Sequence, residues 1–252
     1  MTRKQVPNLI LKNFGEAAPH YSQEAQIQKT FAWLLAKVCS KETIPQGIWA
    51  DLGAGTGLLA EALEALNPNQ SVLRVDGSTE MLSQHSPNSK TQLWDLNSGL
   101  PTWPREPTLI ASNFALHWLT NPRKRIQEWF KALTPGGWLA LTVPVEGSFK
   151  EWHLASKKTG LPCTAMSLPS HCDLIEALHP ESIRHEQLHT FTQKASRVYS
   201  LLKPMVKVGA QGNQRVSMNV GEWRKLQRAW PCCKQDKSLT LTWFIQVLLV
   251  QR

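Results

Sequence analysis

A glycine-rich turn constrains the fold of this chain more than any other feature. Residues 47–52 form a short, mostly apolar segment typical of a buried strand, and residues 51–57 read Asp-Leu-Gly-Ala-Gly-Thr-Gly. Leucines then recur at helical spacing between Leu58 and Leu66. Because glycine has no Cβ and accepts positive φ, such a turn lets backbone N–H groups approach a ligand closely. The segment therefore predicts a strand, a tight turn with a ligand site, and a helix.

Strand-like and helix-like segments keep alternating around this unit. Further strands are expected at residues 71–75, 91–94, 108–113 and 138–143. Helices are expected at residues 25–38, 78–83 and 123–133, and residues 14–21 form a shorter helix or a loop. This alternation predicts an α/β fold with a doubly wound, mostly parallel sheet, whose ligands bind at the carboxyl ends of the strands.

The pattern changes after Pro144. Helices are expected at residues 148–158, 170–178, 194–206 and 221–230, and strands at residues 183–191 and 239–250, which brings the sheet to seven strands. We expect one domain over residues 1–252. Its parts are an N-terminal helical segment (1–46), a ligand-binding core (47–143), a helical lid that faces the substrate or its carrier (144–238) and a closing strand (239–252).

Composition excludes several classes of protein. With 252 residues, of which 42% are hydrophobic and 19% charged, the chain can bury a substantial core. The longest apolar run, residues 239–250, is interrupted by polar residues and is shorter than the ~20 residues of a membrane span. No apolar segment of a secretory signal follows Met1, so we expect a cytoplasmic protein. The five cysteines form no disulfide framework or common zinc pattern, and no metal is expected.

Positive charge is concentrated in the second part of the chain. Residues 1–150 hold 14 basic and 12 acidic residues, whereas residues 151–252 hold 14 and 7. Such a surplus favours an acidic partner, which can be a nucleic acid, an anionic membrane or an acidic protein. Four cations recur at helical spacing, as on a docking face or an ordinary solvated face: Lys194, Arg197, Lys203 and Lys207. Further basic candidates are Arg215, Arg224, Lys225 and Arg228.

Polar side chains mark the ends of four successive strands. Asp51 precedes the glycines, and Asp76 ends the next strand, 25 residues later, near the offset at which an acidic residue meets ribose hydroxyls. Asp95 ends the third strand, where a carboxylate can accept a hydrogen bond from an exocyclic amine, and Asn113 ends the fourth. Together these groups predict a site for a ligand that carries a nucleoside.

This order of motifs resembles the class I S-adenosylmethionine-dependent methyltransferases. The resemblance covers residues 47–143 and implies a Rossmann-like methyltransferase sheet that binds S-adenosyl-L-methionine. It departs from the family at Ala54, where many members have cysteine, and at Thr108, where an acidic residue is common. The implied cofactor-binding residues are Asp51, Gly53, Gly55, Gly57, Asp76, Ser78, Met81, Asp95, Leu96 and Asn113.

The segment after the fourth strand narrows the choice of methyl acceptor. Methylation of an adenine amine would predict an Asn/Asp-Pro-Pro-aromatic turn, but residues 112–118 read Ser-Asn-Phe-Ala-Leu-His-Trp. Cytosine C5 methylation needs a cysteine nucleophile, and no cysteine lies near a strand end of the core. Nucleic-acid methylation is therefore disfavoured.

A narrower resemblance spans most of the chain. The stretches at residues 14–28, 112–118, 147–151, 201–210 and 226–231 resemble the malonyl-acyl carrier protein O-methyltransferases of biotin synthesis. Departures are His117, where the family often has glutamine, Pro204, where it often has glycine, and the Cys232-Cys233 pair.

The narrower resemblance implies methyl transfer to the free carboxylate of a malonyl thioester. The partner would be acyl carrier protein bearing malonyl, or malonyl-coenzyme A, and no general base is required because the carboxylate is already ionised near pH 7. Candidates to position the substrate are Tyr21, His117 and Trp118. Alternatives are another small carboxylic acid such as an aconitate-like compound, a quinone or RNA acceptor, or a cofactor-binding module without catalysis.

Overall fold

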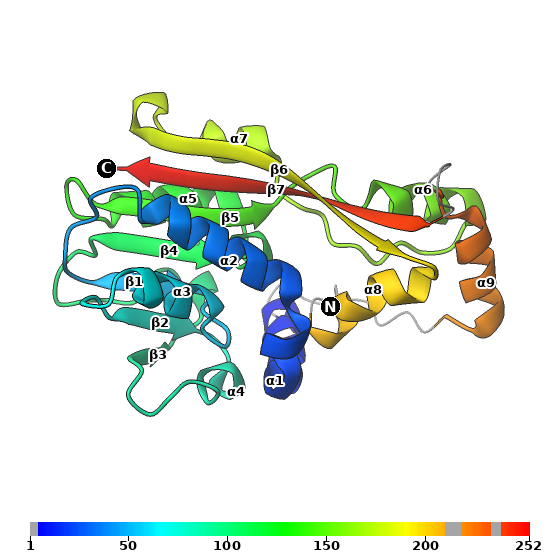
Figure 1. Ribbon diagram of the computed structural model, residues 1–252, viewed down its shortest axis with the longest axis horizontal. Helices are drawn as coiled ribbons and strands as arrows, with labels where there is room; N and C mark the ends of the chain where they lie inside the picture. Colours follow the sequence, from blue (N-terminus) through cyan, green and yellow to red (C-terminus); the bar gives the residue numbers. More distant parts are fainter. Residues whose placement is uncertain (1–4, 210–217, 233–237) are drawn as a thin grey trace.

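One seven-stranded sheet forms the centre of the molecule (Figure 1), in the order β3-β2-β1-β4-β5-β7-β6. The computed structural model describes residues 5–209, 218–232 and 238–252. The strands are β1 (Trp49–Leu52), β2 (Val72–Asp76), β3 (Thr91–Leu93), β4 (Leu109–Asn113), β5 (Trp138–Pro144), β6 (Ile183–Ala195) and β7 (Leu239–Gln251). Strands β1 to β5 pair in parallel, whereas β7 is antiparallel to both β5 and β6. The predicted fold class is confirmed.

Helices cover both faces of the sheet. They are α1 (Gln5–Glu24), α2 (Gln26–Cys39), α3 (Leu58–Leu66), α4 (Thr79–Leu82), α5 (Pro122–Lys131), α6 (Lys150–Thr159), α7 (His171–Ile175), α8 (Val198–Lys207) and α9 (Val220–Ala229). Short 3-10 turns occupy Leu96–Ser98, Leu116–Trp118 and Pro180–Ser182. None of the helices in the described parts of the chain is long and apolar enough to cross a membrane.

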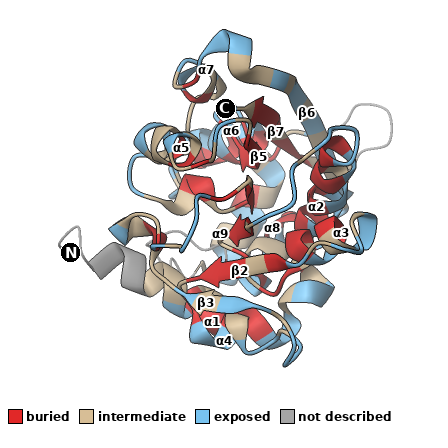
Figure 2. Cartoon of the chain, turned by 90° about the vertical axis from the view of Figure 1, so that its left-hand side faces the viewer, coloured by how far each residue is buried: buried red, intermediate tan, exposed pale blue. Residues whose placement is uncertain are grey.

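Alternating side chains of the strands supply two hydrophobic cores. In β4, Leu109 and Ala111 pack with α2 and α3, whereas Ile110 between them packs with α5 and α7 on the opposite face. This is the period of two expected when successive strand side chains point to opposite faces. The parallel strands are therefore buried on both faces, as Figure 2 shows for the red strands between the helices.

The antiparallel edge differs from the parallel part. Strand β6 alternates between half-buried and mostly exposed residues and, within the described parts of the chain, pairs only with β7. Strands β6 and β7 extend beyond the parallel strands, and α6, α8 and α9 gather around their far end (Figure 1). The region predicted as a helical lid thus includes a strand of the central sheet.

Two helix predictions need correction. Residues 14–21 belong to the long helix α1, which has 20 residues. The helix expected at residues 194–206 begins only at Val198, because Lys194 and Ala195 continue β6 opposite Thr240 and Leu239. Lys194 therefore lies on a strand and not on one helical face with Lys203 and Lys207. Arg215 and Cys233 lie outside the described residues.

Candidate active site

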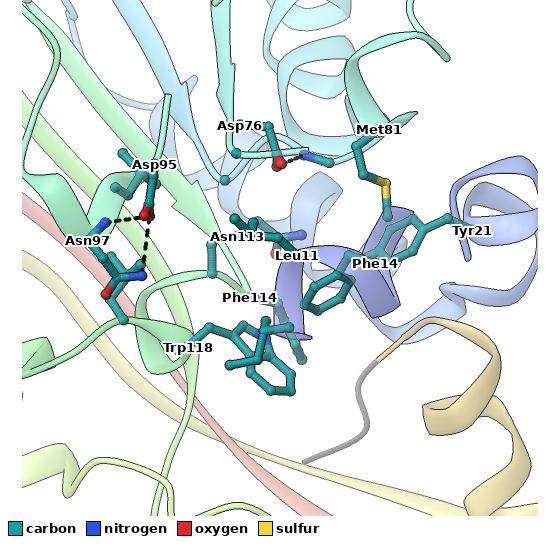
Figure 3. A pocket seen from close by; sticks show the side chains of 17 residues that line it. Leu11, Phe14, Tyr21, Asp76, Met81, Asp95, Asn97, Asn113, Phe114 and Trp118 are labelled. Carbon is teal, nitrogen blue, oxygen red and sulfur yellow. Dashed lines mark hydrogen bonds between the residues drawn. The ribbon is translucent and has the colours of Figure 1, made fainter. Parts of the chain in front are cut away.

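A cavity of about 720 Å³, including its open mouth, lies where β1, β2 and β4 end. Helix α1 closes it on the other side (Figure 3). Nine of the residues singled out from the sequence line this cavity: Tyr21, Gly53, Gly55, Asp76, Met81, Asp95, Leu96, Asn113 and Trp118. The predicted strand-end site is thus brought together in space, although the role of each residue remains a proposal.

The glycines of the turn are required by packing and leave open space where a ligand can approach. Gly53, Gly55 and Gly57 all have positive φ, at 73°, 54° and 97°. A Cβ on Gly53 would lie 2.2 Å from the Cβ of Ala115. A Cβ on Gly55 would meet nothing closer than 4.0 Å, so this backbone faces open space in the cavity. Gly57 is not among the residues that line the cavity and is the N-cap of α3.

Asp76 ties the glycine turn to the end of β2. Its two carboxylate oxygens accept hydrogen bonds from the backbone N–H groups of Gly55 and Ser78, each at 2.8 Å. Burial raises the pKa of the Asp76 carboxyl, against the opposing effect of the backbone N–H groups of Ser78, Gly55 and Gly77. Each oxygen has a second lone pair, so Asp76 can also accept from ligand hydroxyls, as a ribose would provide. Ser78 supports this arrangement by accepting from the backbone N–H of Met81 at 3.2 Å.

Asp51 is the buried acid beneath the turn. Its Oδ2 accepts from the backbone N–H of Ala60 at 3.1 Å, whereas Oδ1 has no hydrogen-bond partner. Burial raises the pKa of Asp51 to about 7. The residue lines a smaller adjoining cavity together with Tyr21 and Asn113. An unpartnered buried carboxylate oxygen suits a cationic group, such as the ammonium of an amino-acid ligand.

The predicted adenine site combines one polar group, Asp95, with two apolar side chains, Leu96 and Met81. Asp95 Oδ1 accepts from the backbone N–H of Asn97 at 2.9 Å and from its Nδ2 at 3.3 Å. Leu96 and Met81 are 5% and 1% exposed and offer apolar walls. Together with the open backbone at Gly55 and the orphaned oxygen of Asp51, these features fit S-adenosylmethionine part by part.

An aromatic wall completes the cavity. The ring of Phe14 packs edge-on against Trp118, with centroids 5.3 Å apart, and against Tyr21 at 6.4 Å. Burial, with the nearby carboxylate of Asp76, raises the pKa of Tyr21, so its hydroxyl stays protonated at neutral pH. Sequence reasoning missed Ile10, Leu11 and Phe14 as lining residues. These residues lie at helical spacing from Tyr21. The pattern could have been found only if residues 5–24 had been predicted as one continuous helix.

Asn113 and Phe114 form the turn after β4. Asn113 Nδ2 donates to the backbone carbonyl of Gln28 at 3.1 Å, and its Oδ1 accepts from Thr142 Oγ1 at 2.5 Å. Phe114 has a φ of 56°, a left-handed conformation that is unfavourable for an aromatic residue. Such strain is typical of residues held in place at functional sites.

His117 does not line the cavity. Its side chain is buried, its Nδ1 has no hydrogen-bond partner, and burial lowers its pKa to about 3. The imidazole is therefore neutral at pH 7, and its ring packs beside Trp118 with centroids 5.1 Å apart. This placement supports a packing role for His117 and leaves Tyr21 and Trp118 as the substrate-facing candidates. No group of three or more metal-ligating side chains occurs in the described parts of the chain.

Comparison with known proteins gives the site a context. A family model described as a methyltransferase domain matches residues 50–141. Malonyl-acyl carrier protein O-methyltransferase of Alcanivorax borkumensis is 24% identical, over 97% of this chain and 86% of that protein. Trans-aconitate 2-methyltransferase of Rhizobium meliloti is 26% identical, over 82% and 86%.

A solved structure extends the likeness to the fold. The SAM-dependent methyltransferase of Thermotoga maritima superposes with a TM-score of 0.52 and 16% identity, over 95% of this chain and 99% of that one. The domain match lies over the glycine turn and the strand ends that form the cavity. The likeness to the malonyl-acyl carrier protein enzymes, expected from the sequence, is confirmed along almost the whole chain. Residues 50–141 therefore form a methyltransferase domain, and the chain is an S-adenosylmethionine-dependent methyltransferase with S-adenosylmethionine as its cofactor.

Proposed function

We propose that the protein methylates the free carboxylate of a malonyl thioester carried on acyl carrier protein or coenzyme A. The products are the malonyl methyl ester and S-adenosylhomocysteine. A relative from Bordetella avium is named a biotin biosynthesis bifunctional protein, which supports a place for this reaction in biotin synthesis. The proposal includes a cytoplasmic location, where such thioesters are made.

The chemistry of the cavity lining carries this proposal. Among the described residues that line it, none is Lys, Arg or His. The carboxylates of Asp76 and Asp95 accept hydrogen bonds from backbone N–H groups, and the Tyr21 hydroxyl is protonated, so none of the three serves readily as a base. A phenol or an amine-type acceptor needs its proton removed, whereas a carboxylate with a pKa near 4 is already ionised. A site without a general base therefore suits a carboxylate acceptor.

Neutral donors can orient such a carboxylate. The Tyr21 hydroxyl and the Trp118 ring N–H belong to side chains that line the cavity, and neither makes a side-chain hydrogen bond to another described residue. Both are donors without a formal charge, so they can hold the oxygen without the strong ion pair that would reduce its nucleophilicity. When bound, the cofactor supplies an electrophilic methyl group on a sulfonium. Tyr21 and Trp118 would align the malonyl oxygen for transfer of that methyl group, and the enclosed cavity would exclude water.

The decisive experiment measures transfer of radiolabelled methyl groups. Malonyl-acyl carrier protein and malonyl-coenzyme A are compared with acetyl-acyl carrier protein, free dicarboxylic acids and total RNA. We expect a base-labile methyl ester on the malonyl thioesters only. Label on acetyl carrier, or on RNA alone, would contradict the proposal.

A free small acid is the second candidate acceptor. The observation that favours it is the likeness to trans-aconitate 2-methyltransferase of Rhizobium meliloti, which also extends over most of both chains. Methylation of trans-aconitate at a higher kcat/KM than any malonyl thioester would select this candidate. Cofactor binding with no transfer to any acid would instead indicate a module without catalysis.

A further inference from the structure

The carbonyl oxygen of Gly55 has a partner outside the strand-end cavity that we assign to the cofactor (the cofactor cavity). His85 Nε2 lies 3.0 Å from this oxygen, across 30 residues of sequence. A carbonyl oxygen can only accept, so Nε2 carries the proton and donates it. Burial is the largest cause that lowers the pKa of His85, so the ring is neutral at neutral pH and its Nδ1 is unprotonated. His85 is not among the described residues that line the cofactor cavity, so it can affect the cofactor only through the turn.

Side chains hold Gly55 at both of its peptide groups. Its N–H donates to Asp76 Oδ2 at 2.8 Å, and its carbonyl accepts from His85 Nε2. Gly55 has a φ of 54°, and glycine adopts this region about as readily as those at negative φ. The residue by itself therefore selects no single conformation. The two side chains, from separate parts of the sequence, provide that selection.

The His85 ring also packs against the last glycine of the turn. A Cβ added to Gly57 would lie 2.6 Å from His85 Cε1 and 2.9 Å from its Nδ1. The ring thus occupies the space that any side chain in place of Gly57 would need. Because the imidazole reaches the Gly55 carbonyl through this space, the packing at Gly57 and the hydrogen bond to Gly55 belong to one arrangement.

One short segment after β2 supplies the groups around Gly55. Asp76 ends β2, Met81 lies in α4, and His85 follows α4. Met81 lines the cofactor cavity, and its Sδ lies 4.0 Å from the position of a Cβ on Gly55. The backbone N–H of His85 donates to the carbonyl of Leu82 at 3.3 Å, which ties His85 to the end of α4. The segment therefore contacts the turn both from within the cavity lining and from outside it.

We propose that His85 is a positioning residue for cofactor binding: its Nε2–H donates to the Gly55 carbonyl and holds Gly55 in the conformation in which its backbone faces the cofactor cavity. The inference concerns the cofactor and does not depend on which acid accepts the methyl group. The effect is preorganisation, since apparent affinity falls in proportion to the fraction of protein in the binding-competent conformation. Without this donor Gly55 keeps only its bond to Asp76, and turn conformations with other φ angles gain population.

Calorimetry with S-adenosylhomocysteine tests the effect on affinity. His85→Leu removes the donor, and we expect the Kd to rise about tenfold, which corresponds to about 1.4 kcal/mol. His85→Gln retains an N–H donor on a side chain of similar reach and should keep the Kd within about threefold of the wild type. His153→Leu, at an exposed histidine of α6, is the matched control and should leave the Kd unchanged.

Two outcomes of the calorimetry would overturn the proposal. One is an unchanged Kd in His85→Leu. The other is an equal rise in Kd for His85→Leu and His85→Gln, because loss of ring packing and not loss of the donor would then explain the change.

Hydrogen exchange at two backbone amides separates positioning from general loosening. The N–H groups of Gly55 and Ser78 bond to different oxygens of the same Asp76 carboxylate. In His85→Leu we expect exchange at Gly55 to accelerate about tenfold, whereas exchange at Ser78 should stay within about twofold of the wild type. Equal acceleration at both amides would show that the whole segment loosens and would overturn the proposal.

The wild-type protein provides a test that does not depend on any variant folding. NMR of isotope-labelled imidazole nitrogens at neutral pH should show the His85 proton on Nε2, and binding of S-adenosylhomocysteine should leave it there. A neutral ring protonated on Nδ1 could not donate to the Gly55 carbonyl and would overturn the proposal.

Discussion

The parallel part of the sheet and its antiparallel edge use their surfaces differently. Strands β1, β4 and β5 are almost wholly buried, so ligands can reach them only at their carboxyl ends, where the cofactor cavity lies. Strand β6 is open along one face, and a second cavity, lined by Gln28, Met205 and Trp243 among others, lies beside it and β7. The comparison teaches that the two regions are open to ligands in different ways: the parallel strands expose only their carboxyl ends, whereas the antiparallel edge is exposed along one face of β6.

The largest loss of stability and of cofactor binding is expected at Gly53, where the turn after β1 packs against Ala115. In Gly53→Ala the new methyl group would collide with Ala115, and we expect loss of cofactor binding and destabilisation of about 3 kcal/mol or more. Gly160→Ala is the matched control, because Gly160 also has positive φ, at 69°, but has nothing within 4 Å of the added Cβ. The control should lose only about 1 kcal/mol from the backbone conformation. Urea unfolding of both variants measures the difference, and similar losses would refute the packing explanation.

The next largest effect is expected from Asp76→Ala. The cofactor Kd should rise about 100-fold, since ribose would lose a charged acceptor, and kcat/KM should fall equally for every acceptor. Calorimetry with S-adenosylhomocysteine measures affinity, and circular dichroism checks that the fold is retained. An unchanged Kd would remove Asp76 from the cofactor site. A fall for one acceptor only would break the separation between the two regions.

Two buried groups of the parallel part should give stability opposite dependences on pH. The pKa of Asp51 is raised to about 7, so the folded protein keeps a proton there and stability falls as pH rises from about 4 to 7. The pKa of His117 is lowered to about 3, so the unfolded chain binds the extra proton and stability rises from about pH 3 to 6.5.

Neutral substitutions separate the two contributions. Asp51→Asn should remove the first slope and His117→Gln the second, and each shift of about three pKa units corresponds to about 4 kcal/mol over its window. Guanidinium unfolding at several pH values from 4 to 8 measures both. Because the two slopes oppose each other between pH 4 and 6.5, stability of Asp51→Asn should rise with pH in that range, and a pH profile identical to that of the wild type would show that Asp51 is not the titrating group.

The smallest effect is expected at the surface of α8. Lys203→Glu should raise the KM for malonyl-acyl carrier protein about fivefold at low salt and leave the KM for a short malonyl thioester of N-acetylcysteamine unchanged. The effect should fade with added salt, because exposed charges are screened. Lys131→Glu, an exposed lysine on α5, is the control. Equal changes for both acceptors would show that α8 does not meet the carrier.

Sequence reasoning predicted the parallel part closely and the acceptor side less well. The glycine turn and the acids at strand ends have local signals, because tight turns and buried strands demand particular residue types. The boundary between β6 and α8 has no such signal, since residues 194–195 join the strand only through pairing with β7. The burial of His117 and the role of α1 in the cavity likewise depend on tertiary packing. The second cavity could not be predicted, because Gln28, Met205 and Trp243 are far apart in the sequence.

The position of β7 also has a consequence for biosynthesis. This strand lies between β5 and β6, yet it follows both in the chain, and β6 has no other strand neighbour among the residues that the structure describes. During translation the parallel strands can pair as they emerge, whereas β6 must wait for more than 40 residues until β7 leaves the ribosome. The long separation makes this closure entropically slow. A nascent chain should therefore gain its affinity for the cofactor before it can recognise an acceptor.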